Sequence, residues 1–390
     1  MPVINRVAAM ADEIAVWRRD FHENPELLFD VHRTAGIVAD KLREFGCDEV
    51  VTGIGRTGVV GVIKGRDTGS GRVIGLRADM DALPIEEATD VPYKSKVPGT
   101  MHACGHDGHT AMLLGAAKYL AETRNFDGTA IMIFQPAEEG GGGGDAMCRD
   151  GLMERFGVQE VYGMHNMPGI PVGSFAIRPG PMMAAADRFD IVIEGKGGHA
   201  ARPHDCVDTL LVACQVVNAL QSIVSRNVDP LESAVISVCA FKAGETYNVI
   251  PQTATLMGTV RTLTEPVRDL CEERIKAVTE AICAAHGATA RIDYRRGYPV
   301  TFNKPENAAF MAEVAAAVGH GDKAIDTTIA PLMGAEDFSY MLEERPGAYI
   351  FIGNGDTAGV HHPKYDFNDQ AIPYGVSLWA KIVETGMAAR

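Results

Sequence analysis

The most restrictive feature of the sequence is an unbroken apolar run, AIMIF, at residues 130–134. A half-exposed strand alternates apolar with polar residues, so a continuous apolar run of this length predicts a strand covered on both faces. Shorter apolar segments at residues 59–63 and 73–76 predict neighbouring strands. A sheet covered on both faces requires packed helices on each side, which indicates an α/β fold.

Helical and strand patterns alternate along the first half of the chain. Residues 38–45 and 110–121 have the pattern of helices, and residues 160–164 predict a further strand. The chain ends in an apolar strand at 348–352 and a helix. The alternation predicts a mixed central sheet with substantial parallel pairing, flanked by helices.

A change of pattern follows residues 178–181, where two prolines and a glycine predict a linker. The elements after it follow the order strand–helix–strand–strand–helix–strand, which is typical of a ferredoxin-like α+β sandwich. They are expected at 188–194, 208–225, 234–241, 253–261, 266–285 and 288–294. The sequence therefore predicts an α/β domain formed by residues 1–180 and 296–390, interrupted by an inserted ferredoxin-like domain at 181–295.

Composition excludes several classes of partner. The chain has 36 basic and 51 acidic residues, a net charge of −15, which repels phosphate backbones and argues against nucleic acid. No segment reaches the roughly 18–20 apolar residues of a membrane span, and the first residues lack the pattern of a secretory signal. The eight cysteines are scattered, so we expect free thiols in a cytoplasmic protein.

Reactive side chains are densest at residues 102–109, which hold three of the 12 histidines together with a cysteine and an aspartate. Thiolate, imidazole and carboxylate groups are the ligands of Zn²⁺ and similar ions. Cys104 and His106 are two residues apart, so a looped backbone can turn both toward one ion. Asp107 and His109 can orient such ligands through hydrogen bonds. The alternative is a helix start whose histidines are merely polar.

A run of five glycines lies at residues 140–144. It lacks the Gly-Lys-Ser/Thr sequence that follows a phosphate-binding loop, so a nucleotide site is not indicated. We expect a mobile loop beside the site.

Acidic or histidine side chains follow four of the predicted strands. They are Asp79 and Asp81, Glu138 and Glu139, His165, and His361. Each alone is equally compatible with an ordinary surface position. Because the carboxyl ends of parallel strands meet at one edge, together they predict a hydrolytic centre of two metal ions. One of the paired glutamates would bind metal and the other would act as general base, and the residues do not decide which.

Eight motifs give the chain a resemblance to a known family. They are RADMDALP at 77–84, MHACGHDGH at 101–109, QPAEEG at 135–140, GMH at 163–165, GGHAARPH at 197–204, NVIP at 248–251, GAEDF at 334–338 and HHP at 361–363. In this order they resemble the metal-dependent amidohydrolases of the aminoacylase and carboxypeptidase superfamily. The branch that they resemble contains hippurate hydrolases, N-acyl-L-amino-acid amidohydrolases and the plant auxin-conjugate hydrolases.

The resemblance implies a set of metal ligands for two divalent ions per subunit, with Zn²⁺, Mn²⁺, Co²⁺ and Ni²⁺ as candidates. The ligands would be Cys104, His106, Glu139, His165 and His361, with Cys104 bridging the two ions. Glu138 would be the general base. Asp79, Asp81, Asp107 and His109 would support the ligands. The last motif departs from the family's His-Asn-Pro or His-Ser-Pro, and the spacing to Pro363 favours His361 over His362.

The resemblance also implies that the inserted domain is a lid that forms a homodimer or a higher homo-oligomer. His199 would stabilise the oxyanion, reaching the site of the partner subunit, and Asn248 and Arg261 would bind the substrate carboxylate. The expected reaction is hydrolysis of the amide bond of an N-acyl amino acid, such as an N-acetyl or N-benzoyl compound. Alternatives are dipeptidase or carboxypeptidase cleavage, a cysteine hydrolase with Cys104 as nucleophile, and a non-catalytic metal-binding dimer.

Overall fold

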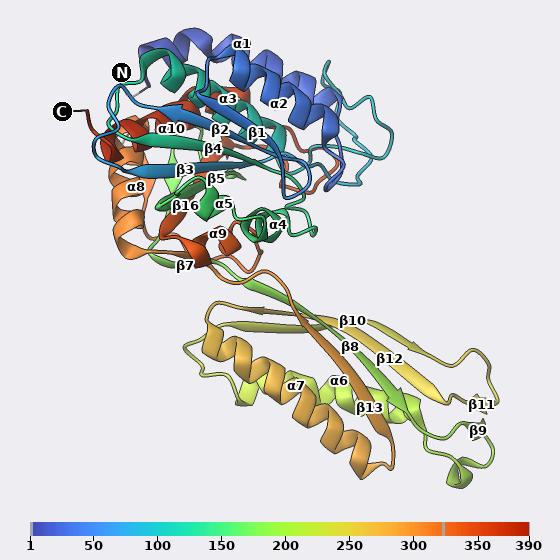
Figure 1. Ribbon diagram of the computed structural model, residues 1–390. Helices are drawn as coiled ribbons and strands as arrows, with labels where there is room; N and C mark the ends of the chain where they lie inside the picture. The colour runs from blue at the N-terminus through green and yellow to red at the C-terminus, as the bar shows by residue number, and fades with distance from the viewer. Residues whose placement is uncertain (1–2, 322–323, 390) are drawn as a thin grey trace. The chain divides into compact units, whose positions relative to one another are not determined.

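The computed structural model describes residues 3–321 and 324–389, which form two compact units (Figure 1). Unit 1 comprises Met1–Met182, Phe302–Ala330 and Asp337–Arg390, and unit 2 comprises Met183–Thr301 and Pro331–Glu336. The sequence predicts the short segment Pro331–Glu336 as part of the α/β domain of residues 1–180 and 296–390, but it belongs to unit 2. It groups with unit 2 because the main-chain N–H of Ala184 donates to the carbonyl groups of Leu332 and Gly334, at 3.0 and 2.8 Å.

Within the described residues, unit 1 contains an eight-stranded mixed sheet in the order β1-β2-β4-β3-β5-β16-β6-β15. The strands in that order are β1 (Glu49–Ile54), β2 (Gly58–Lys64), β4 (Thr129–Gln135), β3 (Val73–Asp79), β5 (Glu160–Pro168), β16 (Gly347–Gly355), β6 (Phe175–Ala176) and β15 (Ile325–Asp326). Strand β3 pairs in parallel with both β4 and β5, and β5 also pairs in parallel with β16. Strand β2 pairs antiparallel with both β1 and β4. The predicted mixed sheet with substantial parallel pairing is confirmed.

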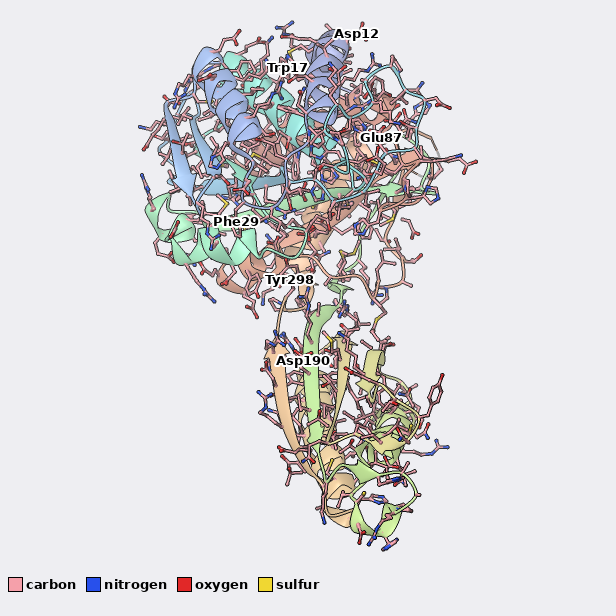
Figure 2. The ribbon with its side chains drawn as sticks, turned by 90° about the vertical axis from the view of Figure 1, so that its right-hand side faces the viewer. Asp12, Trp17, Phe29, Glu87, Asp190 and Tyr298 are labelled. Atoms are coloured by element: carbon pink, nitrogen blue, oxygen red, sulfur yellow. The ribbon has the colours of Figure 1, made fainter. Side chains whose placement is uncertain are left out.

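Helices cover both faces of this sheet, with α1, α2 and α3 on one face and α4, α5 and α9 on the other (Figure 1). The helices of unit 1 are α1 (Asn5–Glu23), α2 (His32–Glu44), α3 (His106–Thr123), α4 (Gly143–Arg149), α5 (Leu152–Arg155), α8 (Pro305–Val318), α9 (Ser339–Glu344) and α10 (Ile372–Gly386), with a 3-10 turn η2 (Asp369–Ala371). Trp17 lies on α1 (Figure 2), and its ring centroid is 5.6 Å from that of Phe45. None of the helices in the described part of the chain is both long and apolar enough to cross a membrane.

The central strand β4 shows why the apolar run constrains the fold. Ala130, Met132 and Phe134 join the apolar cluster formed with α1, α2, α3, α8 and α10. Ile131 and Ile133 face the opposite side and are equally buried. Both faces of β4 are therefore covered, as the sequence predicts.

The parallel strands bring polar side chains to one edge of the sheet. Asp79 at the end of β3 pairs in register with Gln135 at the end of β4. His165 in β5 pairs with Phe351 in β16. Because these strands run in the same direction, the segments that follow them emerge at the same edge.

Unit 2 contains a four-stranded antiparallel sheet in the order β10-β12-β8-β13 and the helices α6 and α7. Its elements are β8 (Ala185–Glu194), β9 (Gly198–His199), η1 (Pro203–Asp205), α6 (Thr209–Arg226), β10 (Ala234–Ala243), β11 (Val249–Ile250), β12 (Thr253–Thr262), α7 (Glu265–Ala285) and β13 (Thr289–Arg296). The long elements follow the predicted order of strands and helices. Strand β7 (Gly180–Met183) pairs with β14 (Thr301–Asn303), where the chain enters and leaves this unit.

Two local expectations were wrong. Helix α3 begins at His106 rather than at Thr110, because Gly105 with φ 91° forms its N-terminal boundary. The glycine run is not an open loop throughout, because α4 begins at Gly143. A Cβ at Gly143 would lie 1.6 Å from the carbonyl oxygen of Pro136, so the chain packs too closely there for any other residue.

A buried charge network joins α1 to the start of α3. His22 Nδ1 lies 2.8 Å from Asp107 Oδ2, and Arg18 Nη1 lies 3.6 Å from the same oxygen. His22 Nε2 lies 3.3 Å from Glu87 Oε1. Burial alone would lower the pKa of His22, but its hydrogen bonds with Asp107 and Glu87 raise that pKa to about 9. His22 is therefore a buried cation at neutral pH.

Replacing this cation should destabilise unit 1 strongly. In His22→Leu, Asp107 keeps only the 3.6 Å contact with Arg18, so we expect the free energy of unfolding to fall by about 3 kcal/mol at pH 7. The control is His32→Leu on the surface, where the side chain is 75% exposed, and where we expect a change below about 0.5 kcal/mol. Urea unfolding measures both values, and equal effects would contradict the role of the network.

The same network predicts that the stability of the folded chain depends on pH. The pKa of His22 is higher in the folded chain than in the unfolded chain, where it is close to 6.5. The stability that it contributes is therefore complete below pH 6.5 and is lost as the pH rises through about 9. The stability difference between wild type and His22→Leu should shrink over that interval.

Candidate metal centre

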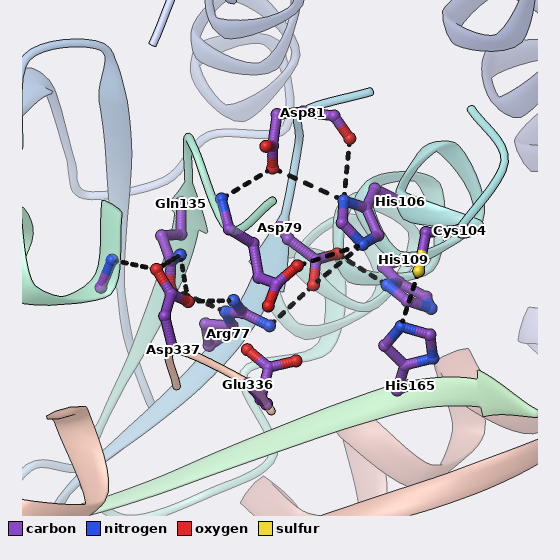
Figure 3. Close-up of polar contacts among 12 residues, drawn as sticks. Arg77, Asp79, Asp81, Cys104, His106, His109, Gln135, His165, Glu336 and Asp337 are labelled. Carbon is purple, nitrogen blue, oxygen red and sulfur yellow. Dashed lines mark hydrogen bonds and ion pairs between the residues drawn. The ribbon is translucent and has the colours of Figure 1, made fainter. Parts of the chain in front are cut away.

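A cluster of potential metal ligands lies at the carboxyl edge of the parallel strands (Figure 3). Cys104 Sγ is 3.3 Å from His165 Nε2, and both side chains are buried. Cys104, His106 and His165 each place one ligand atom within 4.8 Å of the other two. Three such atoms at this spacing can surround a single cation.

A second group of three ligand atoms shares the same thiol. Cys104, Glu139 and His361 also lie within 4.8 Å of one another, and His361 Nε2 is 3.3 Å from Glu139 Oε1. The structure thus brings together all five of the predicted ligands. Cys104 belongs to both groups, which is the arrangement expected of a bridging ligand.

The two buried histidines are held in the tautomer that suits metal binding. His106 Nδ1 donates to the main-chain oxygen of Asp81 at 2.8 Å, and His165 Nδ1 donates to that of Asn166 at 2.6 Å. Each hydrogen bond holds a proton on Nδ1 and turns Nε2 toward the cluster. The orientation of both rings is therefore fixed before any ion binds.

An unsatisfied polar atom shows that these residues fit a cation. Among the described residues, His106 Nε2 is buried and has no hydrogen-bond partner. A buried polar atom without a partner costs about 1–3 kcal/mol, and a metal ion would satisfy it. The set of thiolate, imidazole and carboxylate donors matches the preference of Zn²⁺ and related transition ions.

The electrostatics of the cluster favour positive charge. Hydrogen bonds with Cys104 and Glu139 raise the pKa of His361 to about 10. Burial and the nearby His109 lower the pKa of His165 well below its ordinary value, so that its ring is neutral. The carboxylate of Glu139, which stabilises a protonated His361, would equally stabilise a bound cation.

Asp81 places the two glutamates. Its Oδ1 accepts from the main-chain N–H of Glu138 at 2.9 Å, and its Oδ2 accepts from that of Glu139 at 3.0 Å. The residue before them, Ala137, has a positive φ of 55°, which is unfavourable for a residue with a Cβ. The turn therefore brings both carboxylates to the cluster, with Glu138 Oε2 and Glu139 Oε1 each 4.0 Å from His106 Nε2.

Asp79 lies beside the cluster and accepts two hydrogen bonds. Its Oδ1 accepts from His109 Nδ1 at 2.6 Å, and its Oδ2 accepts from Arg77 Nη1 at 2.7 Å (Figure 3). Burial alone would raise the pKa of Asp79, but His106 and Arg77 hold it well below its ordinary value. Arg77 in turn donates to Asp337 at 3.0 Å. Asp79 is thus a buried anion beside the candidate ligands.

The geometry distinguishes the two consecutive histidines of the last motif. His361 Nε2 lies 3.3 Å from Glu139 Oε1, and the main-chain N–H of His361 donates to the carbonyl of Ala103 at 2.7 Å. His362 is exposed, and its Nδ1 accepts from the main-chain N–H of Lys364 at 3.0 Å. The structure brings His361 into the cluster and leaves His362 outside it.

The candidate residues of the inserted segment lie in unit 2, and the structure separates them into two groups. His199 in β9 pairs with Val249 in β11, next to Asn248. Arg261 lies near the other end of β12, eight residues beyond Thr253. Eight residues of extended strand span about 26 Å, so Asn248 and Arg261 are far apart within one chain.

Sequence reasoning missed two buried residues that contact the ligand segments, Asn166 and Tyr365. Asn166 follows His165 directly in β5, and the only signal in the sequence is its place next to a candidate ligand. Tyr365 lies four residues after His361 in an irregular loop, where no periodic pattern predicts burial. Both are fully buried.

Comparisons with known proteins point to one family. A family model described as Peptidase family M20/M25/M40 matches residues 75–385. A hippurate hydrolase of Campylobacter jejuni is 46% identical over 382 residues, which cover 98% of each chain. Thermostable carboxypeptidase 2 of Saccharolobus solfataricus is 41% identical over 367 residues, covering 93% of this chain and 91% of the relative.

Solved structures agree with these matches. The crystal structure of a dinuclear metal-binding peptidase of the M20 family from Bacillus subtilis has a TM-score of 0.85 and 35% identity. The match covers 97% of this chain and 99% of that chain. The shared fold therefore extends over nearly the whole sequence.

Proposed function

Because this chain belongs to the peptidase family M20/M25/M40, we propose that it hydrolyses the amide bond of N-acyl amino acids, giving a carboxylate and a free amino acid. The proposal rests chiefly on one observation, the two groups of three ligand atoms that share Cys104 Sγ. The similarity to a hippurate hydrolase supports an acyl group such as benzoyl. N-acetyl groups belong to the same chemical class.

The proposed ligands are Cys104, His106, Glu139, His165 and His361, holding two divalent ions of which zinc, manganese, cobalt and nickel are candidates. Two ions held there would lower the pKa of a water molecule and polarise the amide carbonyl. Asp79, Asp81, Asp107 and His109 hold the ligand-bearing segments through the contacts described above.

Glu138 is the proposed general base. Its carboxylate accepts a proton from the water whose oxygen attacks the carbonyl carbon. When the C–N bond breaks, the protonated Glu138 returns this proton to the leaving nitrogen. Asp81 fixes the main chain of Glu138, so that the base needs little rearrangement to reach both positions.

We further propose that unit 2 is an inserted ferredoxin-like lid that forms a homodimer or a higher homo-oligomer. The order of its elements supports that topology. Asn248 and Arg261 lie at opposite ends of this unit. They could contact the same substrate carboxylate only if two different copies of the chain supplied them, which supports an oligomer.

His199 is the proposed donor to the oxyanion, supplied from the lid. In His199→Ala we expect kcat to fall by about 10²-fold, because one donor to the developing charge is lost, whereas the metal content should stay unchanged. Steady-state kinetics and elemental analysis of the purified variant test this together. The control is His204→Ala, an exposed neighbour whose side chain is 72% accessible. An unchanged kcat in His199→Ala would remove His199 from the mechanism.

A cysteine hydrolase is the second candidate function, because the 3.3 Å contact between Cys104 and His165 resembles a nucleophile and its base. Burial raises the pKa of the Cys104 thiol, which opposes a free thiolate nucleophile.

The carboxypeptidase relative favours peptide substrates as a further alternative within the same metal chemistry. A panel of N-benzoyl, N-acetyl and dipeptide substrates distinguishes N-acyl amino acid hydrolysis from peptide cleavage, and we expect the N-acyl amino acids to be cleaved fastest. No hydrolysis of any panel member would favour a non-catalytic metal-binding dimer.

A further inference from the structure

One buried side chain connects the segments that carry the candidate ligands. Asn166 is fully buried, and its Nδ2 donates to the main-chain oxygen of Cys104 at 2.6 Å. Its Oδ1 accepts from the hydroxyl of Tyr365 at 2.5 Å, and Tyr365 is also fully buried. Asn166 itself follows His165. Asn166 therefore connects the three segments that carry Cys104, His165 and His361.

Helix α3 contributes a fourth segment. His109 Nδ1 donates to Asp79, so its Nε2 must accept, and it does so from the main-chain N–H of Asn166 at 3.0 Å. His109 Nε2 also lies 3.1 Å from Asn166 Nδ2. Both polar atoms of the Asn166 side chain are therefore engaged, and the orientation of the amide is determined by its neighbours.

Tyr365 fixes the loop that carries His361. The main-chain N–H of His361 donates to the carbonyl of Ala103 at 2.7 Å, and the hydroxyl of Tyr365 reaches the amide that holds Cys104. His361 has a positive φ of 64°, a conformation that persists only where surrounding contacts impose it. The loop is thus attached to the Cys104 segment at both ends.

The close approach of these groups also explains a glycine. Gly105 has a φ of 91°, and a Cβ there would lie 2.2 Å from Asn166 Nδ2 and 2.5 Å from the hydroxyl oxygen of Tyr365. The turn between Cys104 and His106 therefore packs directly against the Asn166–Tyr365 pair. Any side chain at this position would separate them.

We propose that Asn166 and Tyr365 are a positioning pair that sets the place of the bridging Cys104 relative to His165 and His361, and thereby the affinity of the centre for its second ion. This inference rests on the ligand set given under the proposed function. Neither residue is proposed to contact substrate. Groups that orient metal ligands contribute about 10–100-fold to metal affinity, which gives the expected size of the effect.

The test uses the full-length apo protein titrated with Co²⁺, whose bond to a thiolate gives an absorption band in the near ultraviolet. In Tyr365→Phe, only the hydroxyl is removed. We expect Co²⁺ to bind about tenfold more weakly at one of the two sites, with an altered thiolate band. Asn166→Asp keeps the shape but replaces the donor to Cys104 with an acceptor, and we expect at least the same loss.

The chain offers a matched control in a second buried tyrosine of unit 1. The hydroxyl of Tyr162 donates to Glu160 at 2.8 Å and accepts from Asn307 Nδ2 at 2.9 Å, near the start of β5. Tyr162→Phe therefore removes an equally buried hydroxyl from a tyrosine–asparagine contact that holds no candidate ligand. Melting temperatures of the apo proteins show the structural cost in each variant.

A selective loss of Co²⁺ affinity in Tyr365→Phe, with an apo melting temperature close to that of Tyr162→Phe, supports the positioning pair. Co²⁺ affinities and spectra in Tyr365→Phe and Asn166→Asp that equal those of the wild type would overturn it, whatever happens to stability. A wild-type protein that binds Co²⁺ without a thiolate band would refute the ligand set itself, and with it this inference. The second and third results therefore separate failure of the pair from failure of the proposed function.

Discussion

Glu138→Gln should lose nearly all hydrolytic activity and keep its metal. The glutamine has the shape of glutamate but cannot accept the proton of the attacking water, so we expect kcat to fall by about 10²–10⁴-fold. Glu138 is not among the five proposed ligands, so two ions per chain should remain. Assays with an N-benzoyl amino acid and elemental analysis of the same preparation give both numbers.

The neighbouring residue provides the contrast. Glu139→Gln removes a proposed ligand whose Oε1 faces His361 at 3.3 Å. We expect this variant to lose metal as well as activity. If both variants lost metal equally, or if Glu138→Gln retained wild-type turnover, the assignment of Glu138 as general base and Glu139 as metal ligand would be incorrect.

Removal of the metal should abolish activity reversibly. After exhaustive chelation we expect turnover below about 1% of the starting value, with recovery on addition of Zn²⁺, Mn²⁺, Co²⁺ or Ni²⁺, because these ions activate the water and polarise the carbonyl. The ion that restores most activity identifies the preferred metal.

Cys104→Ala sharpens this experiment, since Cys104 belongs to both groups of ligand atoms. We expect a loss of affinity at both sites and no recovery at metal concentrations that restore the wild type. A chelated wild-type enzyme that stays fully active, together with an inactive Cys104→Ala, would instead establish the thiol as the nucleophile.

The sequence predicts the sheet well because the sheet depends on local signals, whereas the five candidate ligands follow from the resemblance to a family and stay a prediction. The apolar run at 130–134 forces a strand with two covered faces, and the histidines and carboxylates follow strand ends whose parallel pairing brings them together. The sequence pattern predicts the start of α3 too late, because Gly105 and the histidines are weak helix formers and tertiary contacts determine the boundary.

The supporting residues could not be predicted in the same way. Tyr365 lies in an irregular loop, and its contact with Asn166 joins residues 199 positions apart. His22 resembles any polar residue of an amphipathic helix until Asp107 and Glu87 are seen beside it. The separation of Asn248 from Arg261 depends on the length and direction of β12, which the motifs alone do not show.

We propose that five side chains from distant segments hold two divalent ions next to Glu138. Crystals grown with Zn²⁺ and measured at the zinc absorption edge test it most directly. We expect two anomalous peaks per chain, about 3.5–4 Å apart, on either side of Cys104 Sγ, with His165 near one peak and His361 near the other. Crystals of the active enzyme without a peak beside Cys104, or with His361 turned away from both ions, would contradict it.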